Sequence, residues 1–151
     1  MKLKRYMFWI VARTGLFLYS RFPIFGRLRA AMGVIQKGGA FLVIERNDGR
    51  GISFPGGLCN PWEEERRALE REILEETGLK VTSSALIFRY QSDADVKVEV
   101  SAWDVTAEGV LRESWEGTPR WLSLAEFSSR VIAGQRPVVE AIAARQRSEN
   151  Q

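Results

Sequence analysis

The feature that most constrains this chain is an acidic stretch between residues 57 and 79. It reads GLCNPWEEERRALEREILEETGL and places Glu72, Glu75 and Glu76 at positions i, i+3 and i+4. On a helix of about 3.6 residues per turn, these three carboxylates share one face and their like charges repel. A divalent cation held by oxygen ligands would offset that repulsion. The stretch therefore predicts a helix with a face suited to bind a cation.

Signals at both ends of the stretch predict the limits of this helix. Asn60 suits the N-cap position, Pro61 suits the first helical position, and Glu63 completes a capping box. Gly78 is placed to end the helix in the left-handed conformation. We therefore expect a helix that begins next to Asn60 and ends before Gly78.

The predicted helix also has an apolar side. Leu69 and Ile73 flank the stripe that contains Glu72 and Glu76, as expected for a strip that faces a core. Most acidic runs are solvated helix faces, and that interpretation stays open at this point. Residues 54–57, with the sequence FPGG, favour a functional site instead. A strand that ends in a glycine turn there would direct backbone amides and carbonyls towards the helix.

These residues resemble the signature of a known family. Gly57 is followed after five residues by Glu63, and after seven more by the run REILEETGL, from Arg71 to Leu79. The pattern matches every fixed position of the Nudix box, so the chain resembles MutT-like Nudix hydrolases. The resemblance implies the α/β Nudix fold, an α/β/α sandwich with a mixed β-sheet. One departure is Trp62, because many relatives carry glycine immediately before the first glutamate.

The resemblance implies Mg²⁺ as the cofactor, with Mn²⁺ as an alternative. Glu75 and Glu76 would be metal ligands, and the carbonyl of Gly56 would belong to the same shell. Glu72 would be a ligand or the general base that acts on water, and Arg71 would orient a glutamate through a charge-assisted pair. Arg71, Glu72 and Glu75 are therefore the expected catalytic residues.

Two further site residues lie outside this cluster. Glu63 would support the metal cluster or simply cap the helix. Glu116 lies in an acidic loop that resembles the closing section of Nudix domains. It is the expected additional metal ligand, and Glu113 is the second choice. Loop glutamates are usually solvated, so a purely structural role stays open for both.

Phe54, Gly57 and Trp62 are the expected substrate contacts. Aromatic residues, including Trp103 and Trp115, are able to stack on a base, although aromatic residues at strand spacing mostly belong to cores. Segments typical of NADH-cleaving and coenzyme A-cleaving relatives are absent from the sequence. By elimination, the expected substrate is a nucleoside triphosphate or a small nucleotide conjugate.

Two functions are compatible with these features. The first is an Mg²⁺-dependent hydrolase that cleaves the diphosphate linkage of a nucleoside diphosphate derivative by attack of an activated water. The alternative is a non-catalytic Nudix-fold module that binds a nucleotide for regulation. The intact set of Glu72, Glu75 and Glu76 favours hydrolysis, because a binding module has no need of all three.

Composition favours one domain in a reducing compartment. The 151 residues are 45% apolar and 27% charged, with no histidine and one cysteine, Cys59. Histidine-based catalysis, histidine-ligated zinc and an internal disulfide are therefore excluded. We expect a cytoplasmic protein that is peripheral to the membrane at most. Specific nucleic-acid binding is not expected, and a homodimer stays open.

Charge is unevenly distributed along the chain. Residues 1–30 contain seven basic residues and no acidic one, a charge of +7, whereas the remainder has 15 basic and 19 acidic residues, a charge of −4. We divide the chain into a basic, apolar, helical N-terminal arm of residues 1–27 and a Nudix hydrolase domain of residues 28–151. The arm would lie on an anionic membrane or, slightly favoured, pack on the domain or a second subunit. Its apolar run is too short to span a bilayer.

Alternating and continuous apolar runs predict the remaining elements. The expected strands are residues 30–35, 40–44, 52–54, 81–90 and 96–103. A short helix is expected from Ala125, and a final helix over residues 131–147.

Overall fold

The computed structural model describes residues 10, 14, 15, 18, 27–94 and 96–149. The predicted helical arm of residues 1–27 therefore lies almost entirely outside the described residues. None of the helices in the described part of the chain combines the length and the apolar composition that a membrane crossing requires. This part of the chain confirms the predicted α/β class with a mixed sheet.

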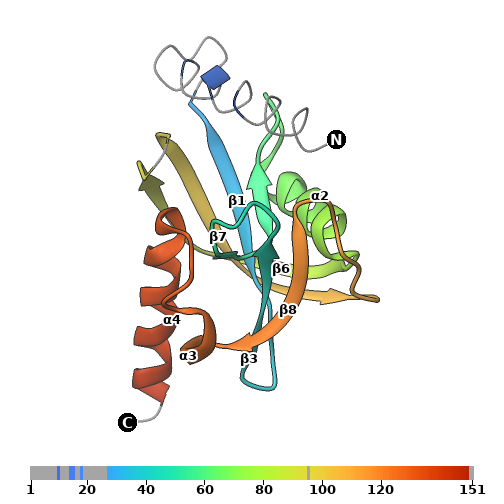
Figure 1. Ribbon diagram of the computed structural model, residues 1–151, viewed down its shortest axis with the longest axis vertical. Coiled ribbons are helices and arrows are strands. Elements are labelled where there is room, and N and C mark those ends of the chain that lie inside the picture. Colours follow the sequence, from blue (N-terminus) through green and yellow to red (C-terminus); the bar gives the residue numbers. More distant parts are fainter. Residues whose placement is uncertain (1–9, 11–13, 16–17, 19–26, 95, 150–151) are drawn as a thin grey trace.

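Two β-sheets form the centre of the domain (Figure 1). The strands of the first sheet are, in order across it, β5 (Gly56–Leu58), β1 (Arg29–Val34), β7 (Val98–Glu108) and β6 (Lys80–Ser92). β1 and β7 are parallel, whereas β5 and β6 run antiparallel to their neighbours, so this sheet is mixed. The strands of the second sheet, all antiparallel, are β2 (Gln36–Lys37), β3 (Ala40–Arg46), β4 (Ile52–Ser53) and β8 (Gly117–Ser123).

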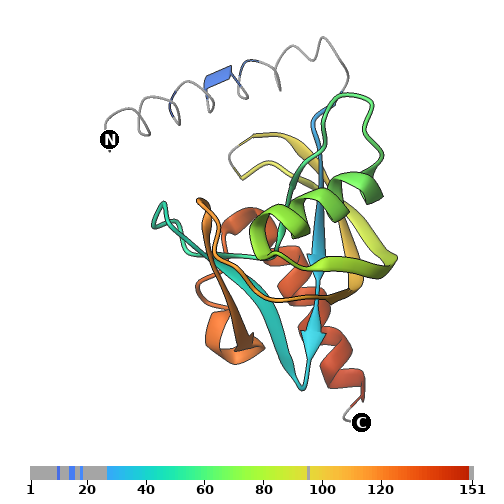
Figure 2. The ribbon, with the colours of Figure 1, turned by 90° about the vertical axis from the view of Figure 1, so that its right-hand side faces the viewer.

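Helices cover the outer faces of these strands. They are α2 (Glu65–Thr77), α3 (Leu124–Phe127), the 3₁₀ helix η1 (Ala133–Gln135) and α4 (Arg136–Glu149). In Figure 1, α2 lies to the right of the strands and α4 to the left. The view turned by 90° in Figure 2 has α2 in front of the strands and α4 behind them. This is the predicted sandwich, with helices on two sides of the sheets.

Each helical layer has its own apolar core. α2 buries Leu69 and Ile73, which the apolar strip of the sequence predicts, against a cluster that includes Ala31, Leu42 and Val105. The cluster on the side of α4 is larger and contains Met32, Val34, Phe41, Val43, Ile52, Phe54, Val100, Ala102, Phe127 and Val138. The position of α2 is therefore fixed by packing, and its acidic face is left for other contacts.

α2 ends at the predicted residue. Gly78 adopts φ of 77°, and its N–H donates a hydrogen bond of 2.9 Å to the carbonyl of Leu74. Glycine adopts this left-handed conformation without a steric penalty, which explains why the helix ends here.

The start of α2 differs from the prediction. The helix begins at Glu65, with Glu64 at the N-cap, about one turn later than expected. Asn60 and Glu63 do exchange hydrogen bonds: the N–H of Asn60 donates to Glu63 Oε2 over 2.8 Å, and the N–H of Glu63 donates to the Asn60 carbonyl over 3.0 Å. These bonds close a separate turn. Trp62 has φ of 63°, which a right-handed helix cannot include.

Three strands also differ from the prediction, and one of them is β7, which continues to Glu108 beyond the predicted residues 96–103. The sequence predicts a turn at residues 55–57, whereas Gly56–Leu58 forms β5 and pairs antiparallel with β1. β6 is longer than the predicted residues 81–90, and it contains two register shifts against β7. Polar residues at both ends of β6 conceal its length, because an edge strand need not bury them.

Candidate functional site

The site begins at the glycine turn, which β1 holds in place. Met32 lies opposite Gly56 in the antiparallel pair, and the N–H of Gly33 donates a hydrogen bond of 2.8 Å to the carbonyl of Pro55. Gly56 has φ of 147°, and a Cβ atom there would collide with the carbonyl oxygen of Ala31. Only glycine fits this position. The backbone N–H of the turn is thereby fixed towards α2.

Glu76 accepts a hydrogen bond from this N–H. The bond from Gly56 to Glu76 Oε2 is 2.8 Å long, and Glu76 is only 4% exposed. The carboxyl group of Glu76 also shares a hydrogen bond with that of Glu116. Burial first, and the contact with Glu116 second, raise the pKa of Glu76 to about 9. Two carboxyl groups that meet away from water require a proton or a cation between them.

Strand pairing brings Glu116 to this point. In the pairing of β3 with β8, Arg46 lies opposite Gly117. The N–H of Asn47 then donates a hydrogen bond of 2.8 Å to the carbonyl of Glu116. Glu113, the second candidate, is exposed and accepts a hydrogen bond of 3.3 Å from a hydroxyl group of β8. Of the two loop glutamates, the structure joins the first one to the buried carboxyl group.

A second cluster surrounds Arg71. Its guanidinium donates two hydrogen bonds of 3.0 Å to the carboxylate of Glu63 and one of 2.6 Å to Oε1 of Glu72. A bond of 3.1 Å reaches the carbonyl of Leu58, and Nη1 lies 3.7 Å from Oε2 of Glu75. The hydrogen bonds from Arg71 lower the pKa of Glu63, so this carboxylate keeps its charge. Arg71 thus contacts three glutamates, where the sequence predicts one.

Glu72 lies between the two clusters. A Cβ atom on Gly57 would lie 2.5 Å from the carboxyl carbon of Glu72, so the carboxyl group covers the backbone of this glycine. Burial raises the pKa of Glu72, the hydrogen bond from Arg71 opposes the rise, and the charge of Glu116 adds to it. Gly57 therefore provides the space in which the Glu72 carboxyl group sits.

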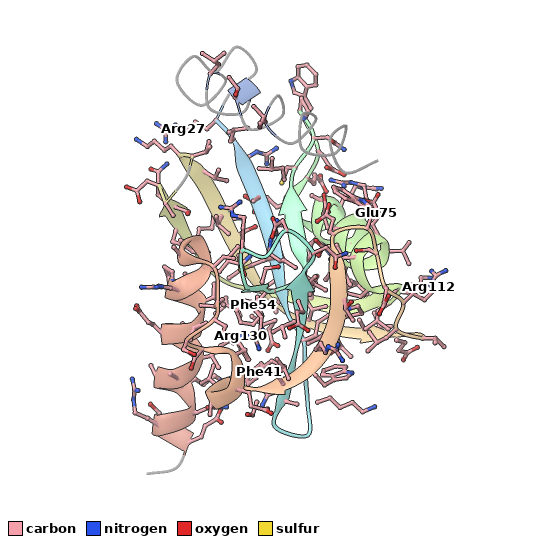
Figure 3. The ribbon with its side chains drawn as sticks, viewed as in Figure 1. Arg27, Phe41, Phe54, Glu75, Arg112 and Arg130 are labelled. Carbon is pink, nitrogen blue, oxygen red and sulfur yellow. The ribbon has the colours of Figure 1, made fainter. Side chains whose placement is uncertain are left out.

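The aromatic candidates divide into buried and exposed residues. Phe54 is 1% exposed and packs edge-on against Phe127, with ring centroids 5.5 Å apart. Figure 3 shows Phe54 in the interior, so the expected stacking of its ring on a substrate is wrong. Trp103 is partly buried and donates its indole N–H to a neighbouring hydroxyl group. Trp62 and Trp115 are 82% and 72% exposed.

Arg46, which the sequence does not predict as a site residue, is a cation that interacts electrostatically with Glu116 and Glu76. Arg46 ends β3, and its Nη2 donates a hydrogen bond of 2.6 Å to Oδ2 of Asp48. The hydrogen bonds to Asp48 raise the pKa of Arg46, and the charges of Glu116 and Glu76 contribute further. In the sequence Arg46 precedes a polar turn, where a solvated charge is the default interpretation. Only the pairing of β3 with β8 reveals its place.

The donor set suits a hard divalent cation. Carboxylate oxygens are the ligands that Mg²⁺ prefers, and the buried pair of Glu76 and Glu116 concentrates them. In the described part of the chain, no three ligating side chains are already gathered in the geometry of a metal site. Arg71 holds Glu72 and Glu75 to one side, and Figure 3 shows Glu75 on α2. The residues fit a cation in chemistry and burial, because Glu72 bonds Arg71 through Oε1 and keeps its second carboxylate oxygen as a donor.

Comparison with known proteins adds independent findings. The family model of the NUDIX domain matches residues 26–142. A Bacillus subtilis (strain 168) protein named "Putative 8-oxo-dGTP diphosphatase YtkD" is 41% identical over 67 residues, which cover 44% of this chain and 42% of that protein. The match therefore spans less than half of that relative.

Two other similar proteins are matched over most of their length. The CTP pyrophosphohydrolase of Escherichia coli (strain K12) is 27% identical over 124 residues, which cover 78% of this chain and 92% of that protein. The solution structure of the E. coli ORF135 protein has a TM-score of 0.68 at 27% identity, covering 78% of this chain and 89% of that one.

The fold and the site together define a class: an α/β sandwich in which a glycine turn and an acidic helix face meet. The chain belongs to the NUDIX domain family, and with its named pyrophosphohydrolase relatives it is a Nudix-type hydrolase. The family resemblance of the sequence is thereby confirmed.

Proposed function

We propose that this protein is an Mg²⁺-dependent hydrolase that cleaves the diphosphate linkage of a nucleoside diphosphate derivative, with Mn²⁺ as a substitute. The observation that carries the proposal is the buried contact between Glu76 and Glu116 beside the glycine turn. The buried carboxyl group of Glu76, whose pKa is raised, takes up either a proton or a cation. A hard cation is the ligand that also suits a diphosphate substrate.

In this proposal the acidic residues have different roles. Glu76, Glu116 and Glu75 would hold the cation, the carbonyl of Gly56 would contribute a further oxygen, and Glu72 would be a ligand or the general base. When bound, the cation supplies charge neutralisation for the diphosphate and acidifies a water molecule. These roles agree with the donor chemistry of the side chains, which offers carboxylate oxygens and no histidine.

Side chains of the protein accept the proton of the attacking water and bind the phosphate groups. Glu72 accepts the proton of the attacking water, because its partly buried carboxyl group has a raised pKa and histidine is absent. Arg71 and Glu63 hold α2 and the turn in one arrangement. Arg46, whose side chain is 24% exposed, offers its guanidinium to phosphate oxygens.

A nucleoside triphosphate is the substrate that we propose. The two curated relatives are named for 8-oxo-dGTP and for CTP, which are both triphosphates. Trp115 is exposed and directly precedes Glu116, so we propose that its indole, and not the buried ring of Phe54, contacts the base. Gly57 leaves room for the backbone to approach the phosphates.

The test is hydrolysis of a substrate panel by wild type and two matched variants. The panel contains the common nucleoside triphosphates, 8-oxo-dGTP and nucleotide sugars, each with Mg²⁺ and with Mn²⁺, and the readout is pyrophosphate or phosphate release. Glu76→Gln should lower turnover by more than about a hundredfold, because even groups that only support a ligand cost ~10–100-fold. Glu113→Gln, which alters an exposed glutamate of the same loop as Glu116, should keep turnover.

Each result has a defined meaning. Turnover that is lost in Glu76→Gln and kept in Glu113→Gln supports the hydrolase and identifies its substrate class. Nucleotide binding without turnover, for every compound and with both metals, would contradict the proposal and favour the non-catalytic binding module.

A further inference from the structure

The carboxylate of Asp48 holds Arg46, the residue that we propose contacts the phosphate groups. Nε of Arg46 donates hydrogen bonds of 3.1 and 3.2 Å to the two carboxylate oxygens, and Nη2 donates one of 2.6 Å to Oδ2. A carboxylate that is bound at two points in this way fixes the plane of a guanidinium. Nη1 takes no part in this contact, and a guanidinium is able to bind a second acceptor through it.

Asp48 is itself fixed by the loop between β3 and β4. Its Oδ1 accepts a hydrogen bond of 3.1 Å from the backbone N–H of Arg50, two residues later, as in an Asx turn. The N–H of Arg46 donates to the carbonyl of Gly51 over 3.1 Å and closes the loop. The side chains of Arg46 and Asp48 are only 24% and 26% exposed, so water screens their contact incompletely.

This ion pair lies beside the proposed cation site. Arg46 is opposite Gly117 in the pairing of β3 with β8, and the charges of Glu116 and Glu76 contribute to its raised pKa. These two carboxyl groups are the ones that we propose hold the cation. A phosphate group bound to that cation would therefore come within electrostatic reach of Arg46.

The turn alone does not explain an aspartate at position 48. An Asx turn needs one oxygen that accepts from the N–H of Arg50, and asparagine provides it as well. Burial opposes the ionisation of Asp48, but the hydrogen bonds from Arg46 and Arg50 outweigh it and lower the pKa, so the carboxylate is charged at neutral pH. The charge and the second oxygen serve the contact with Arg46.

We propose that Asp48 is a positioning residue that fixes the guanidinium of Arg46 for the phosphate groups of the substrate. Asp48 does not contact the substrate in this proposal. It restricts the rotation of the long Arg46 side chain before binding, so that less conformational entropy is lost when the phosphate binds. The inference rests on the proposed role of Arg46 and adds the residue through which that role is achieved.

The first test is the affinity of the full-length protein for a CTP analogue with methylene groups in place of the bridging oxygens. Calorimetry with Mg²⁺ measures it. Asp48→Asn keeps the acceptor for the N–H of Arg50 but removes the charge, and it should weaken binding by about tenfold. Glu45→Gln is the matched control: it breaks the ion pairs of the preceding β3 residue with Arg120 and Arg130, and should leave the affinity unchanged.

A double-mutant cycle separates positioning from a purely structural role. Arg46→Gln should weaken binding of the analogue by about a hundredfold. Addition of Asp48→Asn to this variant should change the affinity by less than about twofold, because the carboxylate acts only through the guanidinium. A further tenfold loss in the double variant would show that Asp48 acts independently of Arg46 and would overturn the proposal.

Inorganic tripolyphosphate shows whether the contact is made to phosphate. It has no base, and Asp48→Asn should weaken its binding by the same factor as that of the analogue. A loss confined to the nucleotide analogue would contradict the proposal, and so would equal or tighter binding of both probes by Asp48→Asn. Absence of binding of both probes by wild type would also overturn it. These are binding measurements, so a wild type that binds the probes and hydrolyses no nucleotide contradicts the proposed hydrolase and not the role of Asp48.

Discussion

The two acidic clusters of α2 differ in what neutralises their charge. Around Arg71, a guanidinium contacts three carboxylates, and the pKa of Glu63 is lowered. On the other side, the buried carboxyl group of Glu76 faces that of Glu116, and the pKa of Glu76 is raised. In the first cluster, the guanidinium of Arg71 neutralises the carboxylates and fixes α2 to the turn that precedes it. The second is the cluster that we propose binds a cation, and it lowers the stability of the protein when none is bound.

The largest expected effect is on the pH dependence of stability without metal. The pKa of Glu76 rises from 4.5 to about 9 on folding, so the folded state holds this proton more tightly than the unfolded chain does. The resulting contribution to stability is complete below the unfolded pKa and is lost as the pH rises through the folded pKa. We expect the free energy of unfolding to fall by about 2–4 kcal/mol between about pH 5 and pH 8. Urea denaturation over this pH range, in the presence of a chelator, measures this change in the free energy of unfolding.

Glu76→Gln tests whether Glu76 causes this fall of the free energy of unfolding with pH. The amide group of glutamine does not ionise, yet its oxygen still accepts the hydrogen bond from the N–H of Gly56. The pH dependence of the free energy of unfolding should therefore largely disappear. Glu113→Gln should retain it. Saturating Mg²⁺ should raise the free energy of unfolding of wild type, because the cation binds only to the folded protein. It should not raise that of Glu76→Gln, which lacks one of the proposed ligands. A flat profile for metal-free wild type would contradict the buried carboxyl pair.

The next effect concerns the cluster around Arg71. Arg71→Gln should lower the free energy of unfolding by about 2 kcal/mol, because it leaves partly buried Glu63 and Glu72 without their partner. Arg71→Lys should recover only part of this loss, since an ammonium group cannot reproduce the paired hydrogen bonds. Arg66→Gln is the matched control: its ion pair with Glu70 is exposed, and its loss should change the free energy of unfolding by less than about 0.5 kcal/mol.

A smaller effect is expected where the clusters meet. Gly57→Ala places a methyl group against the Glu72 carboxyl group and should displace it. We expect kcat to fall by about tenfold, as for the loss of other groups that support a metal site. The free energy of unfolding should change by less than about 1 kcal/mol, because Glu72 is able to move towards solvent. Unchanged steady-state kinetics with Mg²⁺ would show that this position of Glu72 is irrelevant to turnover.

The smallest effect is a gain in stability. Trp62→Gly should raise the free energy of unfolding by about 1 kcal/mol, because it removes the penalty of left-handed backbone at a bulky residue. Chemical denaturation of wild type and variant at the same pH measures the difference. A clear loss of stability would show that the indole makes stabilising contacts that outweigh the strain.

The sequence predicts the parts of this fold that depend on local periodicity. The spacing of Leu69 and Ile73 predicts the buried strip of α2, and Gly78 predicts its end. The start of α2 is not predicted correctly, because the cap signals at Asn60 and Glu63 lie on either side of Trp62, a residue with positive φ. The one sequence signal for a left-handed residue 62 is the glycine that many relatives carry there, since glycine adopts positive φ without a steric penalty.

Long-range pairing explains what the sequence could not reveal about the site. In the sequence Arg46 has the features of an ordinary turn charge, and only the register of β3 with β8 places it opposite Gly117. Phe54 precedes a glycine turn and so resembles a surface residue, but the layer that contains Phe127 covers it. The resemblance implies a ligand among the glutamates of this loop, and the β3–β8 pairing brings Glu116, rather than Glu113, next to Glu76.

The pairing of β3 with β8 also determines at which stage of synthesis the proposed cation site is able to form. A nascent chain that has emerged only as far as residue 110 carries the whole acidic helix and the glycine turn. It still lacks Glu116, which takes its place only once β8 has joined β3. Because the second carboxylate arrives with the last strand of the described chain, incomplete translation products would lack the cation site that we propose. They would neither sequester Mg²⁺ nor consume nucleotides at the ribosome.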